Sequence, residues 1–292
     1  MLKKWIEAMR LRTLPVSIAG VIAGTGCAVW HGKFNTLPAL LCLLFAVLAQ
    51  IASNFGNEYY DFANGIDKKG REGFRRGVTE GDISPRAMKA ATFGVLVAAA
   101  LTGCTLLLFG GWWLIIAGIA ILLFALAYST GPYPLSHHGL GDVAVIIFFG
   151  IVPVNLTCYL QCGGWNGIET SMPVSVAVGL LAANVLILNN YRDADDDKKV
   201  GKNTTVVIFG RKTMSLAYLV SGIMAVSLTT GVWFSMPFYT WAVPLACLGI
   251  HILLWIKLGK SHGSAINPLL GKTALNLLLF SLLMLVAITL FR

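Results

Sequence analysis

The chain has 292 residues, of which 57% are hydrophobic and only 12% are charged, and its mean hydropathy is +0.75. Soluble domains carry about 25% charged residues, so this composition excludes a soluble globular protein and indicates a chain that lies in lipid. The formal net charge of +9 comes without any base-reading or base-stacking module, so no nucleic-acid partner is expected.

Long apolar runs recur along the whole sequence and predict an all-α, polytopic membrane protein with a single domain over residues 1–292. A helix needs about 20 apolar residues to cross a bilayer core, and about nine such spans are predicted. They cover roughly 13–31, 37–56, 88–109, 111–129, 141–161, 173–191, 213–233, 238–257 and 271–291. The runs are continuously apolar and too long for the alternating strands of a membrane barrel. The first run has no clear cleavage site, so we expect a retained span and not a removed signal peptide.

The basic residues indicate the orientation of these spans. If the spans alternate in direction, the N-terminus shares one side of the membrane with the loops after spans two, four, six and eight. All of the 22 Lys and Arg residues except Lys33 and Arg292 fall on that side. The positive-inside rule therefore places the N-terminus and these loops in the cytoplasm.

The first polar segment, RLRTLPVS at residues 10–17, opens the first span. Arg10 and Arg12 have two possible roles. They can anchor the helix to lipid headgroups, or they can lie at the mouth of a site and attract an anionic acceptor molecule. The sequence leaves both roles open.

The second polar segment, NFGNEYYDFANGID at residues 54–67, ends the second span. Four of its polar side chains are spaced i, i+3, i+4 and i+7, so they share one helical face: Asn54, Asn57, Glu58 and Asp61. Asp67 follows Gly65, where we expect the helix to end. The sequence thus predicts a stripe of amides and acids at the cytoplasmic end of this helix.

The third segment, STGPYPLSHHGLGD at residues 129–142, follows the fourth span. Its glycine and prolines predict an irregular backbone. Its polar and aromatic candidate residues are Tyr133, His137, His138 and Asp142. Tyr128, which directly precedes the segment, is a further candidate. The two adjacent histidines would face different ways and make a poor metal pair. The tyrosines could equally be interfacial anchors.

The fourth segment, NNYRDADDDKKVGKNT at residues 189–204, ends the sixth span. Asn189, Asp193 and Asp197 are spaced i, i+4 and i+8 and share one helical face. Because the second and sixth spans are four apart, they point the same way, and both stripes end on the cytoplasmic side. This arrangement resembles a weak internal repeat.

Crowded carboxylates repel one another unless a cation joins them, and ionisable groups near lipid are functional candidates by default. Carboxylate and amide oxygens suit Mg²⁺, which binds through a few carboxylates together with substrate phosphates. Basic residues beside both stripes would match the remaining phosphate charge: Arg71, Arg75, Arg76, Arg192, Lys198, Lys199 and Lys202. The pattern favours a ligand with a diphosphate head and a long hydrocarbon tail, although a merely solvated rim is the alternative.

The four segments together resemble the UbiA-type intramembrane prenyltransferase superfamily, and most closely the 1,4-dihydroxy-2-naphthoate polyprenyltransferases of menaquinone biosynthesis. The fourth segment is the most specific, because it meets the pattern NNxRDxxxDxxxGKxT throughout. Two positions depart from the family. Glu58 stands where Asp is usual, and His137 stands where Tyr is usual.

The resemblance implies a ring of nine helices around a central cavity, in the inner membrane of a bacterium, with the active site on the cytoplasmic side. It implies that Mg²⁺ is held by Asn57, Asp61, Asp67, Asp193 and Asp197. The candidate catalytic residues are Asp61, Asp193, Arg192 and Lys202, the last two on the diphosphate. The candidate substrate contacts are Arg12, Asn54, Asn57, Glu58, Tyr128, Tyr133, His137, Asn189 and Asn190.

The implied reaction transfers a polyprenyl group from polyprenyl diphosphate to 1,4-dihydroxy-2-naphthoate, with decarboxylation, to give demethylmenaquinone. Another aromatic acceptor, such as 4-hydroxybenzoate or homogentisate, is an alternative. A secondary transporter is a second alternative, since repeats and buried acids also mark transporters. Transporters, however, bind their ions near the bilayer midplane, whereas both acid stripes lie at helix ends.

Overall fold

A computed structural model describes residues 2–65, 75–129 and 133–292. Eight helical stretches of this part of the chain are long and apolar enough to cross a membrane, and a shorter apolar helix lies between the third and fourth of them. Each of these nine stretches overlaps one of the nine predicted spans, although several of the ends differ. The prediction of an all-α, multi-pass membrane protein is therefore confirmed.

The principal helices are, in chain order, α1 (Leu2–Met9), α2 (Leu14–Trp30), α3 (Thr36–Ala63), α4 (Pro85–Gly110), α5 (Leu114–Ser129), α6 (Gly141–Val145), α7 (Val152–Cys162), α8 (Ile168–Lys199), α9 (Thr205–Leu228), α10 (Thr230–Phe234), α11 (Ala242–Leu258) and α12 (Asn267–Phe291). Helices α6 and α7 are joined by a π-helical segment, Ile146–Ile151, and act as one span.

Local sequence signals fix where the helices start and stop. Ser84 caps α4, since its hydroxyl accepts a hydrogen bond from the Ala87 amide at 3.2 Å, and Pro85 occupies the first turn. Helix α3 ends at Ala63, and Gly65 follows with φ of 67°. Glycine adopts this left-handed conformation without a steric penalty. The expected helix end at Gly65 is therefore confirmed.

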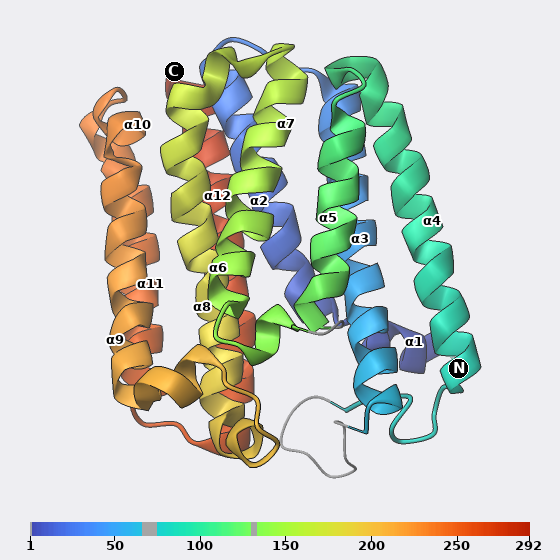
Figure 1. Cartoon of the computed structure of the whole chain (residues 1–292). Coiled ribbons are helices and arrows are strands. Elements are labelled where there is room, and N and C mark those ends of the chain that lie inside the picture. Colours follow the sequence, from blue (N-terminus) through green and yellow to red (C-terminus); the bar gives the residue numbers. More distant parts are fainter. Residues whose placement is uncertain (1, 66–74, 130–132) are drawn as a thin grey trace.

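The spans alternate in direction, and the two chain termini lie at opposite ends of the bundle (Figure 1). Helices α3 and α8 run the same way and end at the edge where the N-terminus lies (Figure 1). Helix α2 packs against α3, α7, α8 and α12, whereas α9 and α11 pack on the outside of α8 and α12. The predicted common direction of the two acid-bearing helices is therefore confirmed.

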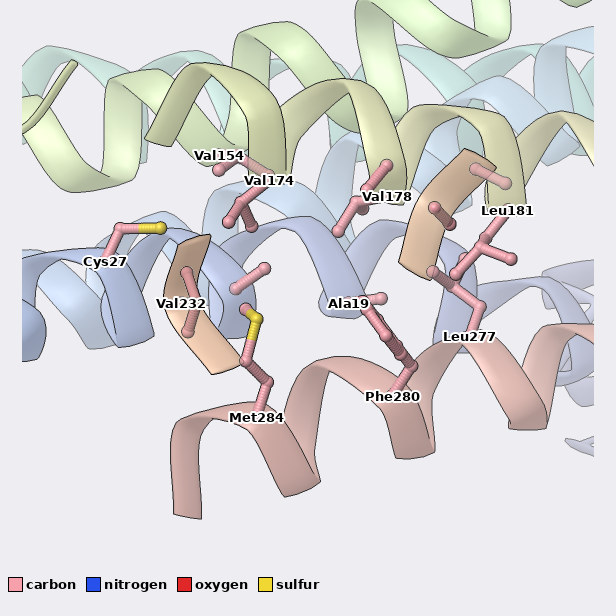
Figure 2. Packing of buried hydrophobic residues seen from close by; sticks show 14 of the residues in the cluster. Ala19, Cys27, Val154, Val174, Val178, Leu181, Val232, Leu277, Phe280 and Met284 are labelled. Atoms are coloured by element: carbon pink, nitrogen blue, oxygen red, sulfur yellow. The ribbon is translucent and has the colours of Figure 1, made fainter. Parts of the chain in front are cut away.

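The largest core cluster lies where α2 passes between α8 and α12. Figure 2 shows Ala19 of α2 beside Phe280 and Leu277 of α12, with Val178 of α8 facing them across the cluster. Small residues let membrane helices approach closely. On Gly24 of α2, a Cβ atom would lie 2.4 Å from the Val154 carbonyl oxygen, so only glycine permits this contact.

The π-helical segment lies against α8 at a second close contact. A Cβ atom on Gly150 would lie 2.4 Å from the Gly179 Cα atom, so the two backbones touch. Single π-helical turns occur frequently at functional sites. Here the segment contributes Phe148 and Phe149 to the wall of the large cavity described below. The close contact with α8 thus fixes the position of one cavity wall.

We expect Gly150→Val to destabilise the protein by about 1–3 kcal/mol, because the added side chain overpacks the contact with Gly179. Thermal unfolding of the purified protein in detergent would measure the loss. Gly94→Val is the matched control, since nothing lies within 4 Å of a Cβ atom there and Gly94 is exposed. Equal melting temperatures for the two variants would contradict the role of the Gly150 contact.

Candidate active site

A large cavity of about 1290 Å³ lies inside the bundle. It is bordered mainly by α2, α3, α4, α5, α6–α7 and α8; α12 adds Leu270 and Gly271, and α9 adds Thr205. No described residue of α11 lines it. The cavity is thus enclosed by one part of the bundle and not by all nine spans equally, because α9 and α11 lie behind α8 and α12.

The cavity has an apolar part and a polar part. Aromatic side chains from α3, α4, α5 and the π-helical segment line the apolar part, including Phe45, Phe93, Phe124 and Phe148. The polar part lies where α3 and α8 end, and it carries amides, acids and basic side chains. Such a cavity suits a ligand with a long hydrocarbon portion and a strongly charged head.

Three residues of the α3 stripe line the cavity: Asn54, Asn57 and Asp61. Arg76, from the segment that leads to α4, lies 3.2 Å from the Asp61 carboxylate. Asn54 is buried, and its amide donates to the Met9 carbonyl at 2.9 Å and to the Thr13 hydroxyl at 3.1 Å. Asn54 therefore holds α3 against the junction of α1 and α2, in addition to facing the cavity.

Glu58 departs from the expectation that it contacts substrate. Its side chain is only 1% exposed and does not line the cavity. Its Oε1 atom accepts a hydrogen bond from the Val78 amide at 3.0 Å. Glu58 lies at the edge of the stripe that faces the α3–α4 connection. Its side chain is longer than that of aspartate and reaches the Val78 amide in that connection. Glu58 thus holds the segment that carries Arg76.

All three residues of the α8 stripe, Asn189, Asp193 and Asp197, line the cavity, and so does the neighbouring Asn190. Lys202 also lines it, and the Lys202 ammonium lies 3.3 Å from the Asp197 carboxylate. Gly201, with φ of 73°, turns the chain back at the end of α8. The Lys202 amide then donates to the Asp197 carbonyl at 2.9 Å, which keeps the lysine beside the stripe.

Arg192 also departs from expectation, because it does not line the cavity and is only 6% exposed. Its guanidinium donates to both carboxylate oxygens of Asp193, at 2.6 and 2.7 Å. It further donates to Asn189 at 2.8 Å and to Asn267 of α12 at 2.7 Å. Arg192 is thus placed to orient Asp193 and Asn189, and its expected contact with a diphosphate stays a prediction.

The third segment joins the fourth through the backbone, since the Asn203 amide donates to the His137 carbonyl at 3.0 Å. Tyr128 and His137 line the cavity. Burial, together with the charges of Lys202 and His138, lowers the pKa of His137. This shift favours the neutral imidazole, in which one ring nitrogen donates a hydrogen bond and the other accepts one.

Tyr133 is a further departure, because its ring is 56% exposed and stacks on His138 outside the cavity lining, with the ring centroids 3.6 Å apart. Arg12, in contrast, lines the cavity as expected of a residue at its mouth. Asp67 lies outside the described residues.

Gln50, which the sequence analysis did not single out, lines the cavity one turn before Asn54, and its side-chain amide donates a hydrogen bond to the Asn54 side chain at 3.2 Å. The i−4 spacing of the stripe could have identified it.

The acids and amides at the polar end of the cavity are candidate ligands for a metal ion. Among the described residues, no three His, Cys, Asp or Glu side chains gather closely enough to hold a metal by themselves. Asp61, Asp193 and Asp197 each lie beside a cationic side chain instead. Mg²⁺ nevertheless fits this set, because it prefers oxygen ligands and is usually bound by one or two carboxylates, waters and substrate phosphates.

Comparison with known proteins gave three informative matches. The UbiA prenyltransferase family model matches residues 17–276. The 1,4-dihydroxy-2-naphthoate octaprenyltransferase of Escherichia coli K12 is 40% identical over 218 residues, which cover 70% of this chain and 68% of the relative. The protein of the same name from Mycobacterium tuberculosis H37Rv is 34% identical over 283 residues, covering 96% of this chain and 94% of the relative.

A solved structure of a UbiA homolog from Archaeoglobus fulgidus, bound to DMAPP and Mg²⁺, has the same fold. Its TM-score is 0.68 at 17% identity, and the alignment covers 98% of this chain and 99% of that one. The fold expected from the sequence resemblance is therefore confirmed.

We expect Arg192→Ala to destabilise the protein by about 3–5 kcal/mol, because it leaves the Asp193 carboxylate buried without its two-point partner. The melting temperature in detergent would measure this loss. Arg211→Ala is the control, since Arg211 forms an ion pair with the 77%-exposed Asp195 side chain, and such pairs contribute about 0–1 kcal/mol. A similar melting temperature for both variants would contradict the inferred role of Arg192.

Proposed function

Because this chain belongs to the UbiA prenyltransferase family, we propose that it transfers a polyprenyl group from polyprenyl diphosphate to 1,4-dihydroxy-2-naphthoate. The family and the relatives already make it an aromatic prenyltransferase of menaquinone biosynthesis. The observation that supports the choice of donor is the cavity itself, in which two acid-bearing helix ends adjoin a long apolar wall. The names of the relatives support the choice of acceptor.

We assign the diphosphate and a Mg²⁺ ion to the polar end of the cavity. Asn57, Asp61, Asp193 and Asp197 would supply oxygen ligands, and Asp67 stays a proposed ligand from the sequence alone. When bound, Mg²⁺ would stabilise the negative charge that develops on the leaving diphosphate. Lys202 and Arg76, now beside carboxylates, are placed to move to diphosphate oxygens. Arg192 would keep Asp193 in position.

The apolar part of the cavity would hold the polyprenyl chain. As the allylic carbon–oxygen bond breaks, the electron pair leaves with the diphosphate and an allylic cation develops. Aromatic side chains such as Phe93, Phe124 and Phe148 exclude water from this cation, and their ring faces stabilise positive charge. Capture by water would give a prenyl alcohol, so an apolar wall is a requirement of the reaction.

The acceptor ring would attack through the carbon that bears its carboxylate. A carbon–carbon bond forms to the allylic carbon, and the bond to the carboxylate then breaks as carbon dioxide leaves and returns its electron pair to the ring. The product is a prenylated hydroquinone, whose oxidation gives demethylmenaquinone. Arg12, Tyr128, His137, Asn189 and Asn190, which line the cavity, are the proposed contacts for the substrates.

We further propose that residues 1–292 form one domain and that the polar end of the cavity faces the cytoplasm of a bacterium, in its inner membrane. The packing of α2 against helices from both halves of the chain supports a single unit. The distribution of basic residues supports the orientation. A transporter is disfavoured, because the acids lie at the ends of α3 and α8 and not near the bilayer midplane.

One assay tests the proposed reaction. Purified protein would be mixed with Mg²⁺, a labelled polyprenyl diphosphate and either 1,4-dihydroxy-2-naphthoate or 4-hydroxybenzoate. We expect a prenylated, decarboxylated product from the naphthoate only, and none when the metal is chelated. Product from 4-hydroxybenzoate alone would replace the acceptor assignment. Passage of substrate across proteoliposomes without any product would favour the transporter.

We expect Asp61→Ala and Asp193→Ala each to lower kcat about a hundredfold or more, because each removes charge that stabilises the transition state. Asp195→Ala is the matched control, since Asp195 belongs to the same acidic run but pairs with Arg211 away from the cavity. Folding would be checked by size-exclusion chromatography and circular dichroism. A well-folded Asp193→Ala protein with near-normal turnover would rule out the metal assignment.

A further inference from the structure

Asp142, the second residue of α6, is an acid that the mechanism above does not use. It lines the cavity and is only 9% exposed. Its Oδ2 atom accepts a hydrogen bond from the Thr205 hydroxyl at the start of α9. Its Oδ1 atom is buried and has no hydrogen-bond partner among the residues that the structure describes. Asp142 thus has one satisfied oxygen and one unsatisfied oxygen.

An unsatisfied oxygen on a buried carboxylate is costly, because the atom loses its hydrogen bonds to water and gains none from protein. Native proteins seldom retain such a group without a reason. The Thr205 bond fixes the carboxylate, so Oδ1 cannot turn away to a protein donor without losing it. Asp142 lines the cavity, so a bound ligand that brings its own hydrogen-bond donor would satisfy this buried oxygen.

The surroundings of Asp142 indicate where that ligand would lie. The Tyr128 hydroxyl is close to the start of α6, since a Cβ atom on Gly141 would lie 3.7 Å from it. Thr205, which bonds to Asp142, comes three residues after Lys202, whose ammonium pairs with Asp197 of the α8 stripe. Asp142 therefore lies at the polar end of the cavity, where a bound ligand would also meet the α8 stripe.

The functional groups of the acceptor determine which of them can donate a hydrogen bond to the Asp142 Oδ1 atom. This step rests on the proposed function. 1,4-Dihydroxy-2-naphthoate carries a carboxylate and two hydroxyl groups. The carboxylate would be repelled by Asp142. The 1-hydroxyl lies beside the carboxylate and donates to it within the molecule, as in salicylate. Only the 4-hydroxyl remains as a free donor.

We propose that Asp142 Oδ1 accepts a hydrogen bond from the 4-hydroxyl of the acceptor and thereby orients the ring, with Thr205 as the residue that positions Asp142. This contact sets which face and edge of the ring meet the allylic cation. It also selects acceptors with a donor para to the first hydroxyl. A monohydroxy acceptor of the same size lacks the group that Oδ1 requires.

The first test compares Michaelis constants for the two substrates. Asp142→Ala is expected to raise KM for 1,4-dihydroxy-2-naphthoate about ten- to a hundredfold, the range of a hydrogen bond to a charged group. KM for the polyprenyl diphosphate should change less than about threefold. Asp142→Asn, which keeps an acceptor oxygen, should show a smaller increase. Thr205→Val should also raise KM for 1,4-dihydroxy-2-naphthoate, whereas Thr205→Ser, which keeps the hydroxyl, should have the wild-type KM.

The second test separates a specific contact from general damage to the cavity. 1-Hydroxy-2-naphthoate lacks the 4-hydroxyl and is used as a competitive inhibitor. Its inhibition constant should be the same for wild type and Asp142→Ala, whereas KM for the dihydroxy acceptor rises only in the variant. Asp195→Ala serves as the control acid and should change neither constant. Asp142→Asn and Thr205→Val keep the test valid if Asp142→Ala does not fold.

Two results would overturn the inference. An unchanged acceptor KM in Asp142→Ala would show that Oδ1 does not meet the acceptor. Equal weakening of the monohydroxy and dihydroxy naphthoates would show that Asp142 only ties α6 to α9. Failure of the proposed function is distinguishable, since the wild-type protein itself would then form no prenylated product from 1,4-dihydroxy-2-naphthoate.

Discussion

The neutralisation of acids at the end of a membrane-embedded cavity is the constraint on which this structure depends. Charged groups near lipid are costly unless they are paired. Asp61, Asp193 and Asp197 lie beside Arg76, Arg192 and Lys202, respectively, with nitrogen–oxygen distances of 3.2, 2.6 and 3.3 Å. These pairs let the protein fold with three acids at the cavity rim before any metal or diphosphate is present.

The three pairs are not equivalent. Arg192 is buried and bound to several side chains of α8 and α12, so it stays in place when the ligand arrives. Lys202 follows the turn at Gly201, and Arg76 comes from the connection that Glu58 holds. These two cations lie in connections between helices, and in the proposed function they would move to the diphosphate. The division between a fixed guanidinium and two adjustable cations follows from where each lies in the fold.

Much of the fold could be predicted from the sequence, because long apolar runs and the placement of basic residues depend on physics that acts locally. The cavity-facing Asn57, Asp61, Asp193 and Asp197 were also predictable, since helical spacing alone put them on one face of α3 or α8. Spacing does not determine what an individual side chain bonds. Glu58 lies at the edge of its stripe and reaches a backbone amide, and this contact depends on the path of the α3–α4 connection.

Asp142 is a second residue whose bonding could not be predicted from the sequence. The sequence names Asp142 as one of several candidates in its segment but does not show what its carboxylate bonds. Its role is indicated by Thr205, which lies 63 residues away along the chain and fixes one carboxylate oxygen, while the other is buried without a partner among the described residues. The acids of the two stripes lie beside cations, whereas Asp142 lies beside a hydroxyl. An acid beside a cation suits a metal or an exchangeable phosphate, and an acid held by a hydroxyl suits a neutral donor. If the proposed function holds, the two kinds of partner would divide the polar end of the cavity into a diphosphate side and an acceptor side.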